Sequence, residues 1–270
     1  MIDGIECIDV HCHIYPDAIA ERAVQGTGKF YDLPLKYGGT VSDLQEKMAK
    51  NGIDHAVVQS VATTPAQVKS INEFIARSVQ NNPNLTGLGT LHPDSTDLKG
   101  DFAHLQELGL HGVKLHPDIQ AFKIDDYRCL KIYELCEEAG LPILMHCGDS
   151  RYDYSNPNRL APVLKIYDKL VVVGAHFGGW SVWENALETL PGFENLYVDC
   201  SSSFYNFTPE QSLAMIRRYG AEHVLFGTDY PMWDIAGEID YFRSLDLDEN
   251  EKKCILNMNV KKIFSIGGNP

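Results

Sequence analysis

The amino-acid sequence predicts an α/β protein built as a single (β/α)8 TIM barrel, on two observations. Eight short runs rich in apolar and β-branched residues alternate with amphipathic segments, and from the second run onward their starts lie roughly 25 to 30 residues apart, the length of one βα unit. No glycine-rich phosphate loop follows the first run, which disfavours the runner-up, an open doubly wound sheet. A length of 270 residues suits one such barrel, so we expect one domain over residues 1–270.

The expected strands include continuous apolar runs such as Ala56–Val58 and Val171–Val173, which are typical of parallel strands buried on both faces. The eight strands are expected at residues 5–13, 55–62, 85–92, 112–116, 141–147, 170–176, 196–202 and 224–229. The first and second strands are about 40 residues apart, too far for a plain connection. We therefore expect Tyr15–Gly39 to form a long functional loop over one end of the barrel.

The segments between the strands carry the start and stop signals of helices. Four of them fit the capping-box pattern, at residues 42–45, 64–67, 181–184 and 208–211. Gly52, Gly140 and Gly220 follow periodic stretches and are expected as C-terminal caps. The last helix is expected from about Asp248 to Phe264.

Composition and charge exclude several classes of protein. Hydrophobic residues at 44% and charged residues at 22% are ordinary for a globular enzyme and exclude a disordered or fibrous chain. A formal net charge of −14 disfavours nucleic-acid and membrane partners, and it suits a metal cation. We expect a small-molecule substrate; the sequence favours neither a monomer nor a homodimer.

The sequence also predicts a cytoplasmic location. Met1–Glu6 has neither a basic region nor an apolar run, so we expect no signal peptide, and no apolar run approaches the roughly 18 residues of a membrane span. The seven cysteines are an odd number without a CxxC pair, which favours reduced, buried thiols.

The ten histidines can be sorted by their place on the expected strands. A barrel carries its active site at the C-terminal ends of its strands, whereas the opposite rim serves stability. His55, His111 and His223 lie at strand starts and are expected to be structural, and His104 lies in the middle of a helix. Six lie at C-terminal strand ends, which indicates a metal or acid–base site: His11, His13, His92, His116, His146 and His176.

The first expected strand contributes two of these histidines. Because side chains alternate along a strand, His11 and His13 point to one side together with Asp9, while Val10 and Cys12 are expected to face outward. An HxH pair alone is weak evidence, since chance supplies one in many chains of this composition. The pair becomes informative with His146, His176 and Asp229 at the ends of later strands, because imidazole and carboxylate ligands suit zinc, manganese or iron.

Five motifs resemble those of the amidohydrolase superfamily, and in particular its amidohydrolase-related group, which also contains aminocarboxymuconate-semialdehyde and resorcylate-type decarboxylases. They occur in the expected order from about Ile5 to the last helix: Asp9-Val-His-Cys-His13, Gly112-Val-Lys-Leu-His-Pro117, Met145-His-Cys-Gly148, Gly174-Ala-His-Phe-Gly-Gly179 and Phe226-Gly-Thr-Asp-Tyr-Pro231. The resemblance implies the fold and a metal site, but it does not specify the substrate.

The resemblance also assigns roles to residues of this sequence. It implies a divalent metal held by His11, His13, His146 and Asp229, with zinc the first expectation and manganese the alternative. Asp229 and His176 are the implied catalytic residues, His176 being a second-metal ligand in two-metal members. Those members have a carboxylated lysine or a glutamate at the end of the fourth strand. Lys114 precedes the end of that strand by two residues, deeper than a bridging ligand would lie, so we expect one metal.

Two reactions fit this set of residues. The first is hydrolysis, in which a metal-activated water attacks the carbonyl of an ester, lactone or amide. The alternative is a non-oxidative decarboxylation of a small carboxylic acid on the same scaffold. A third hypothesis, a catalytically silent metal-binding barrel, is disfavoured by the complete ligand set.

His116, Arg151 and Trp180 are candidate substrate-binding residues, each with a structural alternative. His116, like His92, precedes a proline and equally suits the stabilisation of a turn. Arg151 follows the fifth strand and could hold a substrate carboxylate, or it could be a solvated loop residue. Trp180 follows the sixth strand and is expected to line the pocket. Lys114 is expected to pair with a buried carboxylate such as Asp9.

Overall fold

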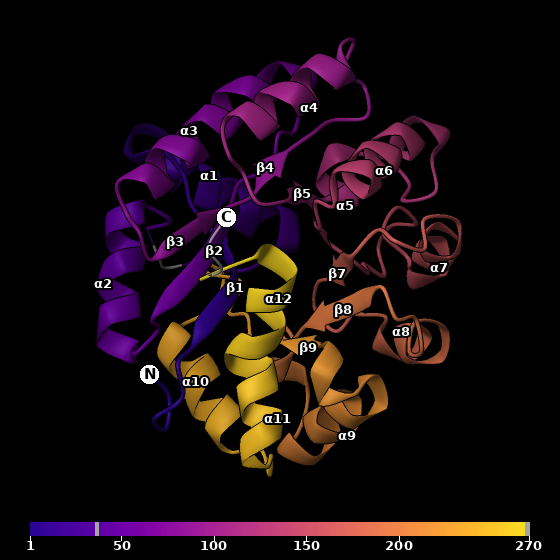
Figure 1. The fold of residues 1–270 in the computed structure, drawn as a ribbon. Helices are drawn as coiled ribbons and strands as arrows, with labels where there is room; N and C mark the ends of the chain where they lie inside the picture. The colour runs from indigo at the N-terminus through magenta and orange to yellow at the C-terminus, as the bar shows by residue number, and fades with distance from the viewer. Residues whose placement is uncertain (36–37, 268–270) are drawn as a thin grey trace.

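The computed structural model describes residues 1–35 and 38–267, with parallel strands at the centre and helices around them (Figure 1). The strands are β1 (Ile8–His13), β2 (His55–Gln59), β3 (Leu85–Gly87), β4 (Gly89–Thr90), β5 (Val113–Leu115), β6 (Ile143–Met145), β7 (Val172–Gly174), β8 (Leu196–Asp199) and β9 (Val224–Leu225). Each strand lies inside one predicted run but is shorter at its ends. The residues left over at the C-terminal ends are free to project into a site.

The strands close into a parallel barrel, which confirms the predicted fold. β3 and β4 are two halves of one strand interrupted at Leu88, whose backbone N–H still donates to the carbonyl of Val58 at 2.9 Å. β1-β2-β3 and β4 to β9 are paired in sequence order, always in parallel. β9 returns to β1, because the N–H of Val10 donates to the carbonyl of Phe226 at 2.9 Å.

A β-bulge in β1 sets the direction of the first two site histidines. Asp9 pairs with Ala56 and Cys12 pairs with Val58, so two residues, Val10 and His11, stand opposite Val57. Bulges of this kind re-aim side chains next to active sites. The expectation that Asp9 shares the face of His11 and His13, with Val10 outside, is therefore wrong.

The barrel interior is filled by apolar residues, one or two from most strands. They form one buried cluster with Val260 and Phe264 of the last helix: Ile8, Val10, Val57, Leu88, Leu144, Val173, Tyr197 and Leu225. In β5 the interior position belongs to Lys114, while its neighbours Val113 and Leu115 pack outward in the larger cluster between strands and helices. The C-terminal end of the barrel is therefore left to polar side chains.

The helices cover the outside of the barrel. They are α1 (Asp17–Tyr31), α2 (Val41–Asn51), α3 (Val68–Gln80), α4 (Leu98–Glu107), α5 (Pro117–Gln120), α6 (Tyr127–Ala139), α7 (Pro157–Ile166), α8 (Trp183–Thr189), α9 (Pro209–Tyr219), α10 (Ile235–Arg243), α11 (Glu249–Lys253) and α12 (Asn259–Phe264). α11 and α12 are joined by one π-helical stretch, so together they match the predicted last helix.

Two of the four predicted capping boxes are confirmed, at Thr64 and Thr208. The other two are wrong. α2 is capped by Thr40, whose side chain accepts the N–H of Asp43, and α8 starts after Val182, since Ser181 adopts a φ of +61°. The three predicted glycine caps are confirmed, and all have positive φ angles.

The segment predicted as a long loop, Tyr15–Gly39, instead contains the 15-residue helix α1. The helix ends at Asp32, which adopts the left-handed conformation with a φ of +56°, and residues 36–37 of the segment lie outside the described part. A helix presents its side chains on defined faces, so this connection holds residues toward the site more rigidly than a loop would.

Among the described residues, no helix combines the length and the apolar character needed to cross a lipid bilayer. All seven cysteines are free thiols, and six of them are buried, in agreement with the prediction.

Candidate metal centre

Three ligand atoms converge at the C-terminal end of the barrel. Two come from β1 and one comes from the segment after β9. Nε2 of His11 lies 3.2 Å from Nε2 of His13 and 3.4 Å from Oδ1 of Asp229, and the His13 to Asp229 distance is 3.5 Å. Ligands of a tetrahedral ion at about 2.0–2.1 Å are about 3.3–3.4 Å from one another. The spacing of these three atoms therefore fits one face of such a site.

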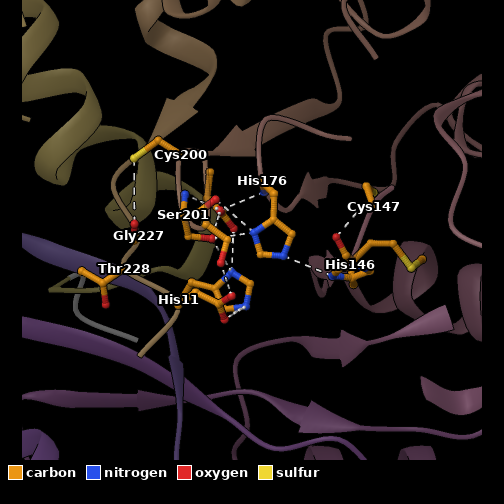
Figure 2. Close-up of polar contacts among 12 residues, drawn as sticks. His11, His146, Cys147, His176, Cys200, Ser201, Gly227 and Thr228 are labelled. Carbon is orange, nitrogen blue, oxygen red and sulfur yellow. Dashed lines mark hydrogen bonds and ion pairs between the residues drawn. The ribbon is translucent and has the colours of Figure 1, made fainter. Parts of the chain in front are cut away.

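The His11 ring is oriented by a buried carboxylate that the sequence analysis did not identify. Nδ1–H of His11 donates to Oδ2 of Asp199 at 2.9 Å, and Ser201 donates its hydroxyl to the other oxygen of Asp199 at 2.5 Å (Figure 2). Because Nδ1 carries the proton, Nε2 presents its lone pair, which is the form in which a histidine binds a metal.

His146 and His176 face each other from neighbouring strand ends, as Figure 2 shows. Nδ1 of His146 lies 3.1 Å from Nε2 of His176. The other nitrogen of each ring faces a carbonyl oxygen, that of Gly148 for His146 and that of Ser201 for His176. Carbonyls only accept, so those nitrogens carry the protons and the two facing nitrogens carry lone pairs.

Asp229 is held by a chain of hydrogen bonds that leaves one oxygen free. Trp233 donates Nε1–H to the hydroxyl of Ser202 at 2.7 Å, and Ser202 donates to Oδ2 of Asp229 at 2.5 Å. Oδ1 therefore remains for the two histidines of β1. Asp229 has a φ of +58°, a sparsely populated region in which non-glycine residues concentrate at functional sites.

Lys114 lies inside the site and does not pair with Asp9. Its Nζ is 3.0 Å from Nε2 of His11, and its nearest opposite charges are those of Asp229 and Asp199. Burial lowers the pKa of Lys114 to about 8. Asp9 instead accepts the backbone N–H and the hydroxyl of Thr228, which ties β1 to the end of β9.

Burial governs the charge state of the site. It lowers the pKa of each imidazole, and the positive charge of Lys114 lowers it further; the rings concerned are His11, His13, His116, His146 and His176, with His176 at about 3. Burial raises the pKa of Asp229 to about 7, against the effect of the Ser202 hydrogen bond and of Lys114. Neutral imidazoles are the form that binds metals.

A tyrosine from helix α1 completes the wall of the site. The hydroxyl of Tyr31 lies 2.7 Å from Nε2 of His116, whose Nδ1 accepts the N–H of Ile119 at the start of α5. Nε2 of His116 must then carry the proton and donate it to the Tyr31 oxygen. In the described part of the chain the Tyr31 hydroxyl has no acceptor for its own hydrogen, which leaves that donor for a substrate.

Two of the three candidate substrate-binding residues line the cavity, and the third does not. His116 and Trp180 line the cavity above the site, whose volume is about 640 Å³. Arg151 does not line it. Its guanidinium pairs with Asp149 through two hydrogen bonds of 2.9 and 2.7 Å and donates to the carbonyl of Phe30 at 2.6 Å. Arg151 therefore fastens the end of α1 to the loop after β6 through three of its N–H groups.

The remaining histidines hold structure together. Each histidine at a strand start bonds a neighbouring element: His55 contacts the hydroxyl of Thr86, His111 the carbonyl of Phe264, and His223 the carbonyl of Leu196. His92 accepts the N–H of Asp94 in a turn and does not line the cavity.

The donor set fits a divalent metal ion. The atoms facing the centre of the site are imidazole lone pairs and one carboxylate oxygen, and among the described residues Lys114 alone supplies a positive charge beside them. Lone pairs facing each other at 3.1 Å, as in His146 and His176, need a cation or a proton between or beside them. His146 lies outside the cluster of His11, His13 and Asp229, so its place in the same coordination sphere remains a prediction.

The sequence analysis did not identify three residues of the site. Asp199 and Ser201 stand at the end of a predicted strand, two residues apart, and a search for polar pairs at strand ends would have found them. Tyr31 had no such signal, because it comes from a helix in a segment interpreted as a loop.

Solved structures share this architecture. An uncharacterised TIM-barrel protein from Bordetella bronchiseptica is 20% identical, with 97% of this chain and 99% of that chain covered and a TM-score of 0.82. A dihydroxybenzoic acid decarboxylase from a Polaromonas species, with bound manganese and the inhibitor 2-nitroresorcinol, is 17% identical, with 98% of each chain covered and a TM-score of 0.71.

A third structure carries a hydrolase name. It is a protein from Pseudomonas putida provisionally named 2-pyrone-4,6-dicarboxylic acid hydrolase, 20% identical, with 98% of this chain and 99% of that chain covered and a TM-score of 0.69. At such low identities these similarities establish the fold alone. No curated protein has detectable sequence similarity to the chain. The sequence model of the amidohydrolase family does match, over residues 8–266, and the chain therefore belongs to that family.

Proposed function

We propose that the protein is a metal-dependent hydrolase that uses an activated water to attack the carbonyl of a small ester, lactone or amide. One observation carries the proposal: His11, His13 and Asp229 present ligand atoms 3.2–3.5 Å apart at the inner end of a substrate-sized cavity. His11, His13, His146 and Asp229 would hold one divalent ion, zinc first and manganese as the alternative. When bound, it supplies Lewis acidity that makes a water nucleophilic near neutral pH and polarises a carbonyl.

Asp229 is suited to move the proton. Its Oδ2 is occupied by Ser202, whereas Oδ1 faces the reaction space, so the carboxylate has an oxygen with which to accept and return a proton. His176 is the second candidate, because its Nε2 lone pair faces the same space while Nδ1 is held by the carbonyl of Ser201.

Tyr31 and Lys114 would act through charge. The free hydroxyl hydrogen of Tyr31 can donate to the carbonyl oxygen as negative charge grows on it. The ammonium of Lys114, 3.0 Å from Nε2 of His11, places a positive charge beside the ligand atoms. His116 would position Tyr31, and Trp180, which contacts the Tyr31 ring edge-on at 5.1 Å, would bound the substrate.

Decarboxylation of a small carboxylic acid is the second candidate, favoured by the similarity to the dihydroxybenzoic acid decarboxylase. Asp229 would then protonate the carbon that loses carbon dioxide. We rank it second because Arg151, the carboxylate clamp suggested by the sequence, is engaged with Asp149 and Phe30 and does not line the cavity.

The test separates the two reactions with one enzyme preparation. Zinc- and manganese-loaded protein is assayed on p-nitrophenyl acetate and dihydrocoumarin for hydrolysis, and on 2,6-dihydroxybenzoate for carbon dioxide release, with His11→Ala as the control. Hydrolysis that is lost in His11→Ala supports the proposal. Carbon dioxide release without hydrolysis would replace it by the second candidate, and inactivity on every probe would overturn both.

A further inference from the structure

The cavity above the metal centre continues outward between helices α1 and α3. On α1 the lining residues are Ile19, Arg22, Ala23, Val24, Gly26, Thr27, Phe30 and Tyr31, and most of them recur at the spacing of three and four residues that marks one side of a helix. On α3 the lining residues are Ser70, Ile71, Phe74 and Arg77, again one face. Each helix therefore turns a side toward open space in this region.

The outer part of the cavity has an apolar wall. Ile19, Ile71 and Phe74 line it, and Ile19 is 39% exposed although its side chain is apolar. Leu33, Leu35 and Val61 add to the same wall. Arg22 and Arg77 also border the cavity; both residues are exposed, as expected of a polar rim around an apolar pocket.

Gly26 keeps this space open. It lies in the interior of α1, where glycine is less favourable than alanine, so conformational preference does not explain it. Its φ is not positive, and a Cβ placed on it would meet no atom within 4 Å. The absent side chain leaves room in the cavity rather than relieving a clash.

We infer that the substrate carries an extended apolar group, which lies between α1 and α3 while its carbonyl group lies at the metal centre. The inference rests on the proposed function for the carbonyl end. The continuity of the cavity from His11 and His13 to Ile71 and Phe74 argues for one occupant that spans both parts. The apolar wall favours a hydrocarbon portion, because burying apolar surface against it removes that surface from water, while Arg22 and Arg77 stay at the rim.

Binding without turnover tests the inference. Zinc-loaded protein is titrated calorimetrically with acetate, butanoate, hexanoate and octanoate, whose carboxylate suits the metal centre. The dissociation constant should fall by up to about fourfold for each added methylene, until the chain fills the cavity. A dissociation constant that does not depend on chain length, or octanoate that does not bind, would overturn the inference.

Two substitutions at one position sharpen the experiment. Gly26→Leu should fill the space and bring the affinity for octanoate close to that for acetate, whereas Gly26→Ala is the matched control and should keep the dependence on chain length. Unchanged octanoate affinity in Gly26→Leu would contradict the location. Calorimetry measures binding and the activity assay measures hydrolysis. Failure of the proposed function and failure of this inference therefore give different results.

Discussion

Nδ1 of His146 lies 3.1 Å from Nε2 of His176, and both nitrogens carry lone pairs because the opposite nitrogen of each ring donates to a carbonyl oxygen. Nε2 of His11 and Nε2 of His13 also face each other, at 3.2 Å, with Nζ of Lys114 3.0 Å from the His11 nitrogen. Burial keeps these rings from accepting a second proton, as their lowered pKa values indicate. The facing lone pairs of His146 and His176 therefore suit a bound cation.

The first prediction concerns metal content and stability. Purified protein should contain about one divalent transition metal per chain, and His11→Ala should lose it. Addition of zinc at about 100 times its dissociation constant should stabilise the metal-free wild type by about 2.7 kcal/mol and leave His11→Ala unchanged. Elemental analysis and thermal unfolding provide the two measurements. Equal metal content in both proteins would contradict the ligand assignment, and two ions per chain would contradict the single-ion site.

The second prediction concerns Glu238 of α10, a buried carboxyl whose Oε2 has no hydrogen-bond partner among the described residues. Burial raises its pKa to about 8 from the ordinary 4.5. Between these two values the folded state binds a proton that the unfolded state releases, so stability falls as pH rises through this window. Glu238→Gln should remove that part of the pH dependence.

The measurement compares urea unfolding of wild type and Glu238→Gln at pH 5 and pH 8. The variant should gain a few kcal/mol relative to wild type at pH 8 and little at pH 5, because each unit of pKa shift corresponds to about 1.4 kcal/mol. Parallel curves for the two proteins across this range would show that Glu238 titrates normally.

The sequence predicted the barrel and the polar end of it, because both follow from periodicity. Strand runs repeated at the length of a βα unit specify the fold, and the rule that sites lie at C-terminal strand ends selected six histidines, His92 among them. The resemblance to the amidohydrolase superfamily then assigned roles to His11, His13, His146, His176 and Asp229. The structure brings His11, His13 and Asp229 together and sets His146 against His176.

The features that the sequence did not predict depend on departures from periodicity and on contacts between residues distant in sequence. The bulge opposite Val57 turns Asp9 out of the face that alternation assigned to it. Tyr31 reaches His116 across 85 positions of the chain, and its helix was interpreted as a loop. Arg151 faces a backbone carbonyl 121 positions away, a contact that no local pattern encodes.

The third prediction concerns Asp229→Asn, assayed on the ester or lactone that the metal-loaded enzyme hydrolyses. Asparagine keeps the size and one ligand oxygen but cannot accept a proton at neutral pH. Turnover should fall by about 10² to 10⁴-fold while the fold and most of the metal remain. Metal content is measured in the same sample, because a lost ion would imitate a lost base. Near wild-type turnover in metal-loaded Asp229→Asn would transfer the proton step to His176.

The last prediction concerns the hydroxyl of Tyr31. Its oxygen accepts from Nε2 of His116, so its hydrogen is directed to the cavity, where it can stabilise charge on a substrate oxygen. Tyr31→Phe keeps the ring contacts with Trp180 and removes this donor, together with the oxygen that accepts the N–H of His116. Since loss of one such donor costs about 10²–10³-fold in kcat, turnover should fall by about that factor with little change in KM.

Tyr152→Phe is the matched control for this substitution. Tyr152 stacks on Phe30 beside Tyr31, at 5.8 Å between ring centroids, but it is 42% exposed and does not line the cavity. Loss of its hydroxyl should leave kcat unchanged. If Tyr31→Phe raised KM and left kcat intact, the hydroxyl would bind substrate and transition state equally, since only a donor that acts on developing charge lowers kcat when it is removed. If both substitutions reduced kcat alike, the effect would come from the packing of α1 on the loop after β6, because both rings take part in that packing and only one hydroxyl faces the cavity.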